Sequence, residues 1–348
     1  MSLAEQENKK KLHGVKYTNA SHRWSYPRKK LLKFIIFLIF IAILGYKSNH
    51  SKKKDVFSTP DPSRVPQKNI SEEPIPLNPL YSYIIEEGRK CVKDPPFLLL
   101  LIPSAPQDGL NRSNLRGTWA IETLVRGVRI TRLFLLGRSS SQEIQADVNL
   151  ESHTFHDIIQ QDFIDCYQNL TLKTLMGLEW VSRFCPKVSY VMKIDSDMFF
   201  NPWFLVEKVL QPSTPAKKNF YTGLVVTGAI PNRQESSKWY MPLSQYSKEV
   251  YPPYCSGTGY LFSGDLSEKI YRQAQGLPMF PFEDVFIGMC LENIGVQISK
   301  PGGDWFIGEK ISYDKCHFVN IVTVHHFRTD ELLELWPDFT SALETCRK

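Results

Sequence analysis

The chain has 348 residues, with 42 Lys and Arg against 36 Asp and Glu and a formal net charge of +6. Eight of the basic residues but only two of the acidic ones lie at positions 1–30, which leaves 34 of each for the rest of the chain. Because a surface that follows a phosphate backbone needs surplus cations on the folded part, this balance argues against nucleic-acid binding. The length favours one large domain with a tail.

Residues 31–46, LLKFIIFLIFIAILGY, form an apolar run that is interrupted only by Lys33. A helix over this run spans about 24 Å at ~1.5 Å per residue, less than a hydrocarbon core of ~30 Å. The alternative is a cleaved signal peptide. The apolar part of a signal peptide is shorter than this run and is followed by a small-residue cleavage site, and neither holds here. We expect a short signal anchor, which suits thin membranes early in the secretory pathway. The basic residues at 1–30 then predict a cytosolic tail and a type II, lumenal arrangement.

Six prolines mixed with Ser, Lys and Glu at 47–94 predict an extended stem. All seven cysteines follow the apolar run, which suits an oxidising lumen with up to three disulfides and one thiol left over. Spacing does not determine the pairing. Cys185 with Cys255 and Cys290 with Cys316 are only guesses.

From position 95 onward, short apolar runs alternate with longer amphipathic ones. Runs at 97–102 and 133–137 predict strands buried on both faces, with a helix at 112–123 between them. A further strand is predicted at 189–194. Between these strands, apolar residues recur at helical spacing: Leu172, Leu175, Met176, Trp180 and Phe184. This alternation predicts an α/β domain with a mainly parallel sheet over residues 95–348.

Asp195 and Asp197 directly follow the predicted strand at 189–194. Ligands of open parallel sheets bind beyond the carboxyl ends of the strands. Carboxylate oxygens there suit Mg²⁺ or Mn²⁺, which share their coordination sphere with phosphate oxygens. The alternative is an ordinary pair of turn or capping residues, because an Asp-x-Asp sequence is common.

Other polar residues allow two interpretations each. Glu283 and Asp284 fall in the first turn of a predicted helix, where they either stabilise the helix N-terminus or supply a general base. Arg112 and Arg116 lie one helical turn apart and either bind a diphosphate or are solvated charges. His325 and His326 follow another predicted strand, and one of them could be a metal ligand, whereas most single histidines are not.

The segment 251–264, YPPYCSGTGYLFSG, mixes aromatic residues with three glycines. Glycine allows close backbone approach, and flat rings suit the apolar faces of sugars. The alternative is a tight structural loop. The glycine spacing does not fit a dinucleotide-binding fingerprint.

Four stretches together resemble the β-1,3-galactosyltransferases of the wider β-1,3-glycosyltransferase family. They are RSNLRGTW at 112–119, FHDIIQQDFIDCYQNLTLKTLMGLEWV at 155–181, YVMKIDSDMFFN at 190–201, and YPPYCSGTGYLFSGDL at 251–266 followed by FEDVFIGMCL. The resemblance implies a GT-A fold, a UDP-sugar donor, Mn²⁺ and a Golgi membrane location. It also makes Cys166 the candidate for the unpaired thiol, because the family commonly has a small polar residue there.

The resemblance implies a role for each matching residue. Asp284 is the expected catalytic base with Glu283 beside it, and the metal ligands are Asp195, Asp197 and His325. The expected donor site comprises Arg112, Arg116, Trp119, Lys193 and Asp195. The expected acceptor site comprises Trp239, Tyr240, Tyr254, Gly257 and Gly259.

The implied reaction moves galactose from UDP-galactose to the 3-hydroxyl of a terminal N-acetylhexosamine, with inversion, on a glycoprotein or glycolipid glycan. A β-1,3-N-acetylglucosaminyltransferase shares every feature named above. An inactive lectin-like protein retains the aromatic segment but lacks metal-dependent UDP binding. A cation-stabilised adhesion module predicts repeated Ca²⁺ motifs, which the sequence lacks.

Overall fold

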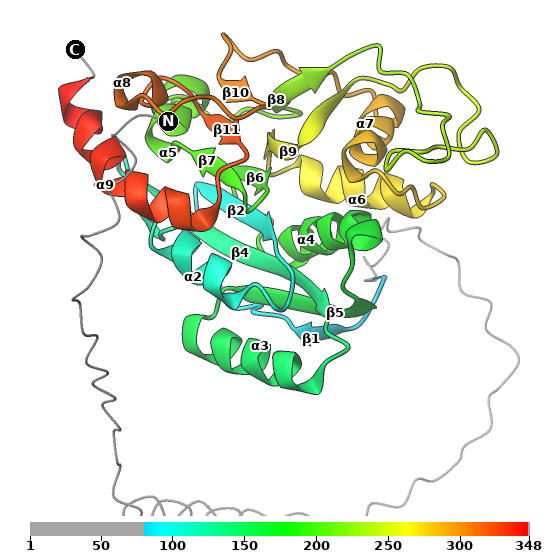
Figure 1. The fold of residues 1–348 in the computed structure, drawn as a ribbon, viewed down its shortest axis with the longest axis horizontal. Helices are drawn as coiled ribbons and strands as arrows, with labels where there is room; N and C mark the ends of the chain where they lie inside the picture. The colour runs from blue at the N-terminus through cyan, green and yellow to red at the C-terminus, as the bar shows by residue number, and fades with distance from the viewer. Residues whose placement is uncertain (1–79, 347–348) are drawn as a thin grey trace, which may run out of the picture. The chain divides into compact units, whose positions relative to one another are not determined.

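The computed structural model describes residues 80–346 (Figure 1). The predicted tail, anchor and most of the predicted stem lie outside these described residues. Within the described range, no helix combines the length and the apolarity that crossing a membrane requires.

A mixed sheet forms the centre of the fold. In spatial order its strands are β1 (Tyr83–Ile85), β5 (Ile158–Ile164), β4 (Val128–Arg138), β2 (Leu98–Pro103), β6 (Tyr190–Ile194), β9 (Tyr254–Ser263) and β8 (Tyr221–Val226), with β3 (Thr123–Val125) paired to β4. The pairs β5–β4, β4–β2 and β2–β6 are parallel, and the pairs towards both edges are antiparallel. The prediction of a mainly parallel sheet therefore holds only for its middle.

Helices cover both faces of this sheet. They are α2 (Gly109–Arg116), α3 (Gln142–Phe155), α4 (Leu170–Phe184), α5 (Pro202–Phe204), α6 (Leu266–Gln275), α7 (Glu283–Asn293), α8 (Lys315–Phe318) and α9 (Thr329–Thr345), with a 3₁₀ turn η1 (Tyr167–Asn169) and a π-helical segment η2 (Leu205–Leu210). The two faces are separate cores, because successive strand residues point to opposite sides. Leu98 and Leu100 of β2 pack with α2 and α9, whereas Leu99 and Leu101 pack with α4, α6 and α7.

A second, small sheet prepares the site. It consists of β10 (Phe306–Ile307), β11 (Thr323–His325) and β7 (Met198–Phe200). Because β11 pairs with β7 in antiparallel register, His325 lies opposite Met198. The residue before Met198 is Asp197, so this register brings two distant parts of the chain together.

The structure corrects two local predictions and decides between two alternatives for a third segment. The predicted helix at 112–123 ends at Arg116, because Gly117 follows and β3 then pairs with β4. The glycine-containing segment after position 253, for which a tight loop was one of two alternatives, is the strand β9, because β6 and β8 pair with it on both sides. The fold also begins before position 95, because β1, which lies within the predicted stem, pairs with β5.

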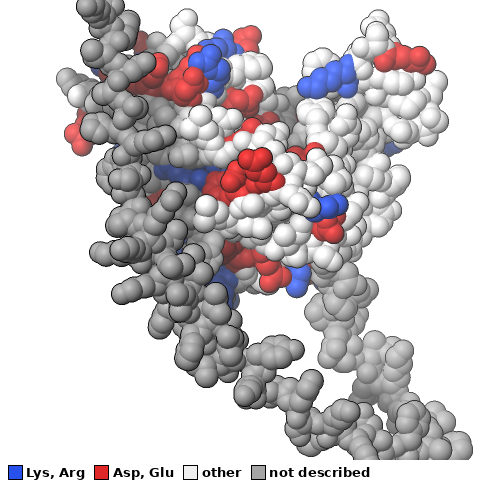
Figure 2. All heavy atoms as spheres, turned by 60° about the horizontal axis from the view of Figure 1, so that its bottom comes forward, with Lys and Arg blue, Asp and Glu red and all other residues white. Residues whose placement is uncertain are grey.

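Charges on the surface are mixed. On the face shown in Figure 2, Lys and Arg side chains form small separate groups among acidic and uncharged ones. That face therefore offers no continuous cationic surface for a phosphate backbone.

Two disulfides, Cys91–Cys185 and Cys316–Cys346, replace both guessed pairs. Cys166 is free, as expected, but so are Cys255 and Cys290. The guesses failed because pairing depends on which cysteines the fold brings within reach, and sequence spacing does not show this.

The two disulfides are expected to differ in their contribution to stability. They close loops of 94 and 30 residues. The chain-entropy relation gives about 4 to 5 kcal/mol for the longer loop and about 3 to 4 for the shorter. Urea unfolding of the Cys91→Ala/Cys185→Ala and Cys316→Ala/Cys346→Ala variants measures both values. The free and half-buried Cys166, replaced by Ser, is the control, and a larger loss for the shorter loop contradicts the entropic account.

Candidate functional site

A cleft of about 760 Å³ opens beyond the carboxyl end of β6. Its wall includes residues from the β6 tip, from β9, from the start of α7 and from the end of β11: Lys193, Asp195, Asp197, Tyr254, Gly257, Glu283, Asp284, His325 and His326. A smaller cavity of about 390 Å³ adjoins it through Asp197. The cleft thus lies at the end of β6, where the sequence predicts a ligand site.

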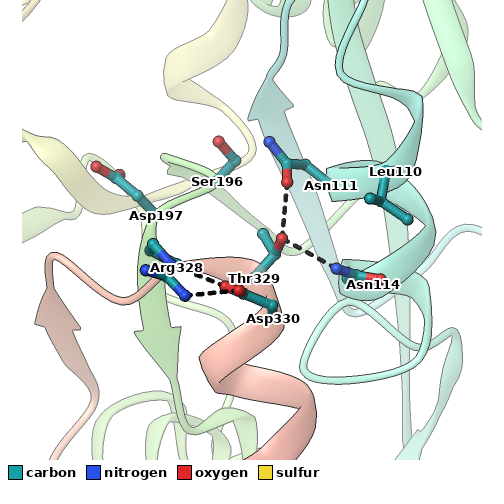
Figure 3. Close-up of a pocket in the computed structure, with 8 residues that line it drawn as sticks. All are labelled: Leu110, Asn111, Asn114, Ser196, Asp197, Arg328, Thr329 and Asp330. Atoms are coloured by element: carbon teal, nitrogen blue, oxygen red, sulfur yellow. Dashed lines mark hydrogen bonds and ion pairs between the residues drawn. The ribbon is translucent and has the colours of Figure 1, made fainter. Parts of the chain in front are cut away.

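The smaller cavity lies between α2 and α9 (Figure 3). The Thr329 hydroxyl donates to Asn111 Oδ1 at 2.8 Å and accepts from Asn114 Nδ2 at 3.2 Å. Arg328 pairs with Asp330, beside these amides. The cavity therefore presents both donors and acceptors next to Asp197, and no sequence pattern marks Thr329 as part of it.

Asp197, His325 and His326 form a cluster in which one ligand atom from each lies within 4.8 Å of the others. His325 Nε2 is 3.3 Å from Asp197 Oδ2, and its Nδ1 is 3.3 Å from the Gly308 carbonyl oxygen. The hydrogen bond to Asp197 raises the pKa of His325. Burial acts in the other direction on Asp197, but the bond from His325 lowers the pKa of that carboxyl.

The resemblance implied only His325 as a ligand, but His326 also belongs to the cluster. Neighbouring residues of a strand point to opposite faces, so His325 and His326 would diverge if β11 continued. His326 instead has φ = 66°, in the left-handed region, and its ring stacks on His325 with centroids 3.7 Å apart. The backbone turn after β11 thereby directs both rings to Asp197.

This donor set can hold a divalent first-row metal ion. A carboxylate oxygen and two imidazole nitrogens are ligands that divalent first-row metals accept. Three protein ligands also leave coordination positions for the oxygens of a diphosphate. Of the three expected metal ligands, Asp197 and His325 belong to this cluster and Asp195 does not.

Asp195 is not part of this cluster. Its Oδ1 is 2.6 Å from the ammonium of Lys193, which is almost fully buried. Lys193 also donates to the Gly257 carbonyl and lies 3.6 Å from Glu283 Oε2. Burial disfavours the ammonium, but Asp195 and Glu283 raise the pKa of Lys193. Lys193 therefore links the β6 tip to α7, and Asp195 supports the site through this cation.

Glu283 and Asp284 lie in the first turn of α7, as predicted, but their surroundings differ. Glu283 is buried and accepts a hydrogen bond from the Tyr260 hydroxyl, and burial raises its pKa. Asp284 is half-buried, and its two oxygens accept from the backbone N–H groups of Gly257 at 3.1 Å and Val285 at 2.8 Å. A carboxylate has about four acceptor positions, so Asp284 retains capacity for a ligand hydroxyl in the cleft.

At Gly257 the β9 backbone lies close to the two carboxylates of α7. A Cβ atom at this position would lie 3.3 Å from Glu283 Oε2 and 3.4 Å from Asp284 Oδ2. The predicted acceptor residues Tyr254, Gly257 and Trp239 line the cleft, and Trp239 is 60% exposed. Tyr240 and Gly259 do not line it. Gly259 instead faces Ile194 in the β6–β9 ladder.

The predicted donor residues of α2 are not in the cleft. Arg112 is buried and pairs with Glu151 at 2.6 Å, and Arg116 pairs with Glu151 and with Asp157 at 2.7 and 2.8 Å. Trp119 is also buried and packs edge-on against Phe200. These side chains therefore build the fold beside the smaller cavity, and their charges are already neutralised by carboxylates.

Arg116→Met is expected to destabilise the protein without affecting nucleotide binding. The change removes one of the two guanidinium partners of the buried Asp157, which keeps Arg132 at 2.7 Å, so the expected cost is about 1.5 to 3 kcal/mol. UDP affinity is expected to stay within about twofold, since less than ~0.4 kcal/mol of binding energy is at stake. Urea unfolding and titration calorimetry measure the two effects. The exposed Arg126, replaced by Met, is the control, and loss of UDP binding at unchanged stability would restore a donor-site role for Arg116.

Comparisons with known proteins add family information to this geometry. A family model described as galactosyltransferase matches residues 110–302. Beta-1,3-galactosyltransferase 2 of Homo sapiens is 44% identical over 259 residues, which cover 74% of this chain but only 61% of that protein. Beta-1,3-galactosyltransferase 1 of Mus musculus is 43% identical over 267 residues, which cover 76% of this chain and 81% of that protein.

The chain therefore matches less than two thirds of the length of the human relative. A solved glycosyltransferase involved in the glycosylation of the major capsid of PBCV-1 covers 70% of this chain and 100% of its own. The identity is 9% and the TM-score is 0.34, so no conclusion about this chain follows from this similarity. The family match includes Asp197 and Asp284 but ends before His325.

Proposed function

The chain belongs to the β-1,3-galactosyltransferase family, and from this premise we propose that it is an inverting β-1,3-galactosyltransferase of GT-A fold. Its donor is UDP-galactose, and its acceptor is the 3-hydroxyl of a terminal N-acetylglucosamine on a glycoprotein or glycolipid glycan. One observation carries the proposal. A single cleft contains both a cluster able to hold a divalent cation and a separate carboxylate, Asp284, with free acceptor capacity.

Asp197, His325 and His326 are the residues that would hold manganese. Bound there, the ion supplies Lewis-acid stabilisation of the negative charge on the departing diphosphate. The protein's own contribution is to fix these ligands. The β7–β11 pairing sets Asp197 against His325, and the Phe327 N–H donates to the Asp197 carbonyl at 2.8 Å. The ligands are thus held in place before the donor binds.

Asp284 acts as the general base. It accepts the proton of the acceptor 3-hydroxyl while that oxygen forms the bond to the anomeric carbon and the bond to UDP breaks. Attack from the face opposite UDP converts the α-linked donor into a β-linked product. One base is sufficient, because no covalent enzyme intermediate forms. Glu283 is a positioning residue, since it is buried and held by Lys193 and Tyr260.

The proposed location is the Golgi membrane, with the catalytic domain in the lumen. The apolar run at 31–46 and the basic residues before it support a single-pass type II arrangement. The two disulfides of the described part suit the oxidising lumen.

A donor screen tests the proposed function. The full chain in detergent is incubated with Mn²⁺, an N-acetylglucosamine-terminated acceptor and either UDP-galactose or UDP-N-acetylglucosamine, and the linkage of the product is determined by NMR. We expect a β-1,3-linked galactose product. Transfer from UDP-N-acetylglucosamine alone would establish the N-acetylglucosaminyltransferase alternative. UDP binding without metal dependence and without transfer would indicate a lectin-like protein.

A further inference from the structure

The loop at 227–253, between β8 and β9, is long but fixed. Figure 1 shows it extending beyond α7. Arg233 crosses the loop, donating to the carbonyl oxygens of Met241 at 2.7 Å and Lys248 at 3.0 Å. The Tyr251 N–H donates to Ala229 O at 2.9 Å, and Met241 is fully buried. A loop of this length without regular structure is usually functional, and this one has a defined shape.

In the conformation that these hydrogen bonds hold, the loop exposes several large apolar side chains to solvent. Their exposed fractions are 76% for Ile230, 60% for Trp239, 67% for Leu243 and 43% for Val250. We call these four residues the β8–β9 surface. Apolar side chains held outward together are typical of a recognition surface rather than of a folding core.

The β8–β9 surface is continuous with the catalytic cleft. Trp239 and Ile230 line the cleft, and Ile230 also lines a further cavity of about 370 Å³ with Leu243 and Val250. A ligand that extends out of the cleft past Ile230 therefore reaches Leu243 and Val250 next.

The chemistry of this extension fits sugar rings. Apolar side chains lie beside Ser247 and Glu249, so the cavity offers both a contact for a C–H face and partners for hydroxyls. Tyr251 lines the adjoining cleft and is only 7% exposed. Its hydroxyl nevertheless has no hydrogen-bond partner among the described residues. A cavity of this size suits a small ligand, whereas a folded protein partner needs about 800 Å² of surface.

We propose that the β8–β9 surface binds the sugars that precede the terminal hexosamine of the acceptor, so that the preferred acceptor is an oligosaccharide rather than a single N-acetylhexosamine. This inference rests on the proposed function, since it names the acceptor class of the same site.

Three acceptors test the inference with the full chain, UDP-galactose and Mn²⁺. They are methyl β-N-acetylglucosaminide, its octyl analogue and a trisaccharide ending in N-acetylglucosamine. We expect kcat/KM for the trisaccharide to exceed that for the methyl glycoside by about tenfold, which corresponds to ~1.4 kcal/mol of additional binding energy. In Leu243→Ser/Val250→Ser this ratio is expected to fall to near one.

Leu150→Ser is the matched control, because Leu150 is 69% exposed on α3, away from the loop. This variant is expected to keep the tenfold ratio. Equal kcat/KM for trisaccharide and methyl glycoside in the wild-type protein overturns the inference but leaves the function intact. A preference for the octyl glycoside that the double variant abolishes overturns it in favour of a lipid aglycone. Failure of all three acceptors with UDP-galactose overturns the proposed function itself.

Discussion

Asp284→Asn is expected to lower kcat for galactose transfer by a factor of about 10² or more while UDP binding survives. An amide has nearly the shape of the carboxylate but cannot accept the proton of the attacking hydroxyl. One of the two backbone donors, Gly257 or Val285, can still be satisfied by the amide oxygen. Because the cation cluster is made by other residues, nucleotide affinity is expected to stay near that of the wild type.

The variant Glu283→Gln distinguishes the positioning role of Glu283 from the base role of Asp284. Glu283 is buried against Lys193 and Tyr260, so its loss is expected to disturb the position of α7 and to lower stability as well as rate. Single-turnover transfer rates, UDP titration calorimetry and urea unfolding of both variants distinguish the two roles. Near-wild-type turnover in Asp284→Asn, together with a large loss in a stably folded Glu283→Gln, would assign the base to Glu283.

The general position of the site could be predicted from the sequence because it depends on local patterns. An apolar run ending in Asp-Ser-Asp is a strand followed by polar residues, and 189–194 does form β6 with Asp195 and Asp197 at its tip. The acidic pair at the start of a helical pattern likewise falls in the first turn of α7. Both predictions needed only neighbours in the chain.

The partners of these residues could not be predicted, because they depend on contacts between distant segments. Asp195 and Asp197 look equivalent in the sequence, but the neighbour of one is Lys193 and that of the other is His325. His326 joins the cluster through one left-handed backbone angle. The charge of Arg112 is compatible with an anion site, but Glu151 of α3 pairs with it, and the sequence does not show this contact.

The strand β9 shows a competition between local preference and tertiary pairing. Its glycines lower the intrinsic preference for a strand, which is why a tight loop was the structural alternative for this segment. Pairing with β6 and β8 on both sides outweighs this preference. In return, the absence of a side chain at Gly257 lets Glu283 and Asp284 approach the strand. Gly257, one of the residues that weaken the local preference for a strand, is therefore also the one that lies against Glu283 and Asp284.

Asp197→Ala and His325→Ala are each expected to weaken manganese binding by more than about 100-fold, and His326→Ala is expected to weaken it substantially as well. Each change removes one of the three candidate ligands. Asp195→Ala is expected to cost only about 10- to 100-fold, because Asp195 acts through Lys193 and the loss of a residue that supports the ligands has effects of this size. Mn²⁺ titrations followed by electron paramagnetic resonance, with UDP present, measure all four affinities independently of catalysis.

The order of these four effects is the decisive result. His153→Ala is the control, because His153 is exposed on α3. If Asp195→Ala weakens manganese binding more than His326→Ala does, then the ion is held by the two carboxylates of the β6 tip, and Lys193 must release Asp195 when the ion binds. If UDP binds equally well with and without manganese, the cluster has no role in holding the donor. A ranking with Asp197 and the two histidines above Asp195 would mean that the turn after β11, as much as the strand tip of β6, creates the metal site.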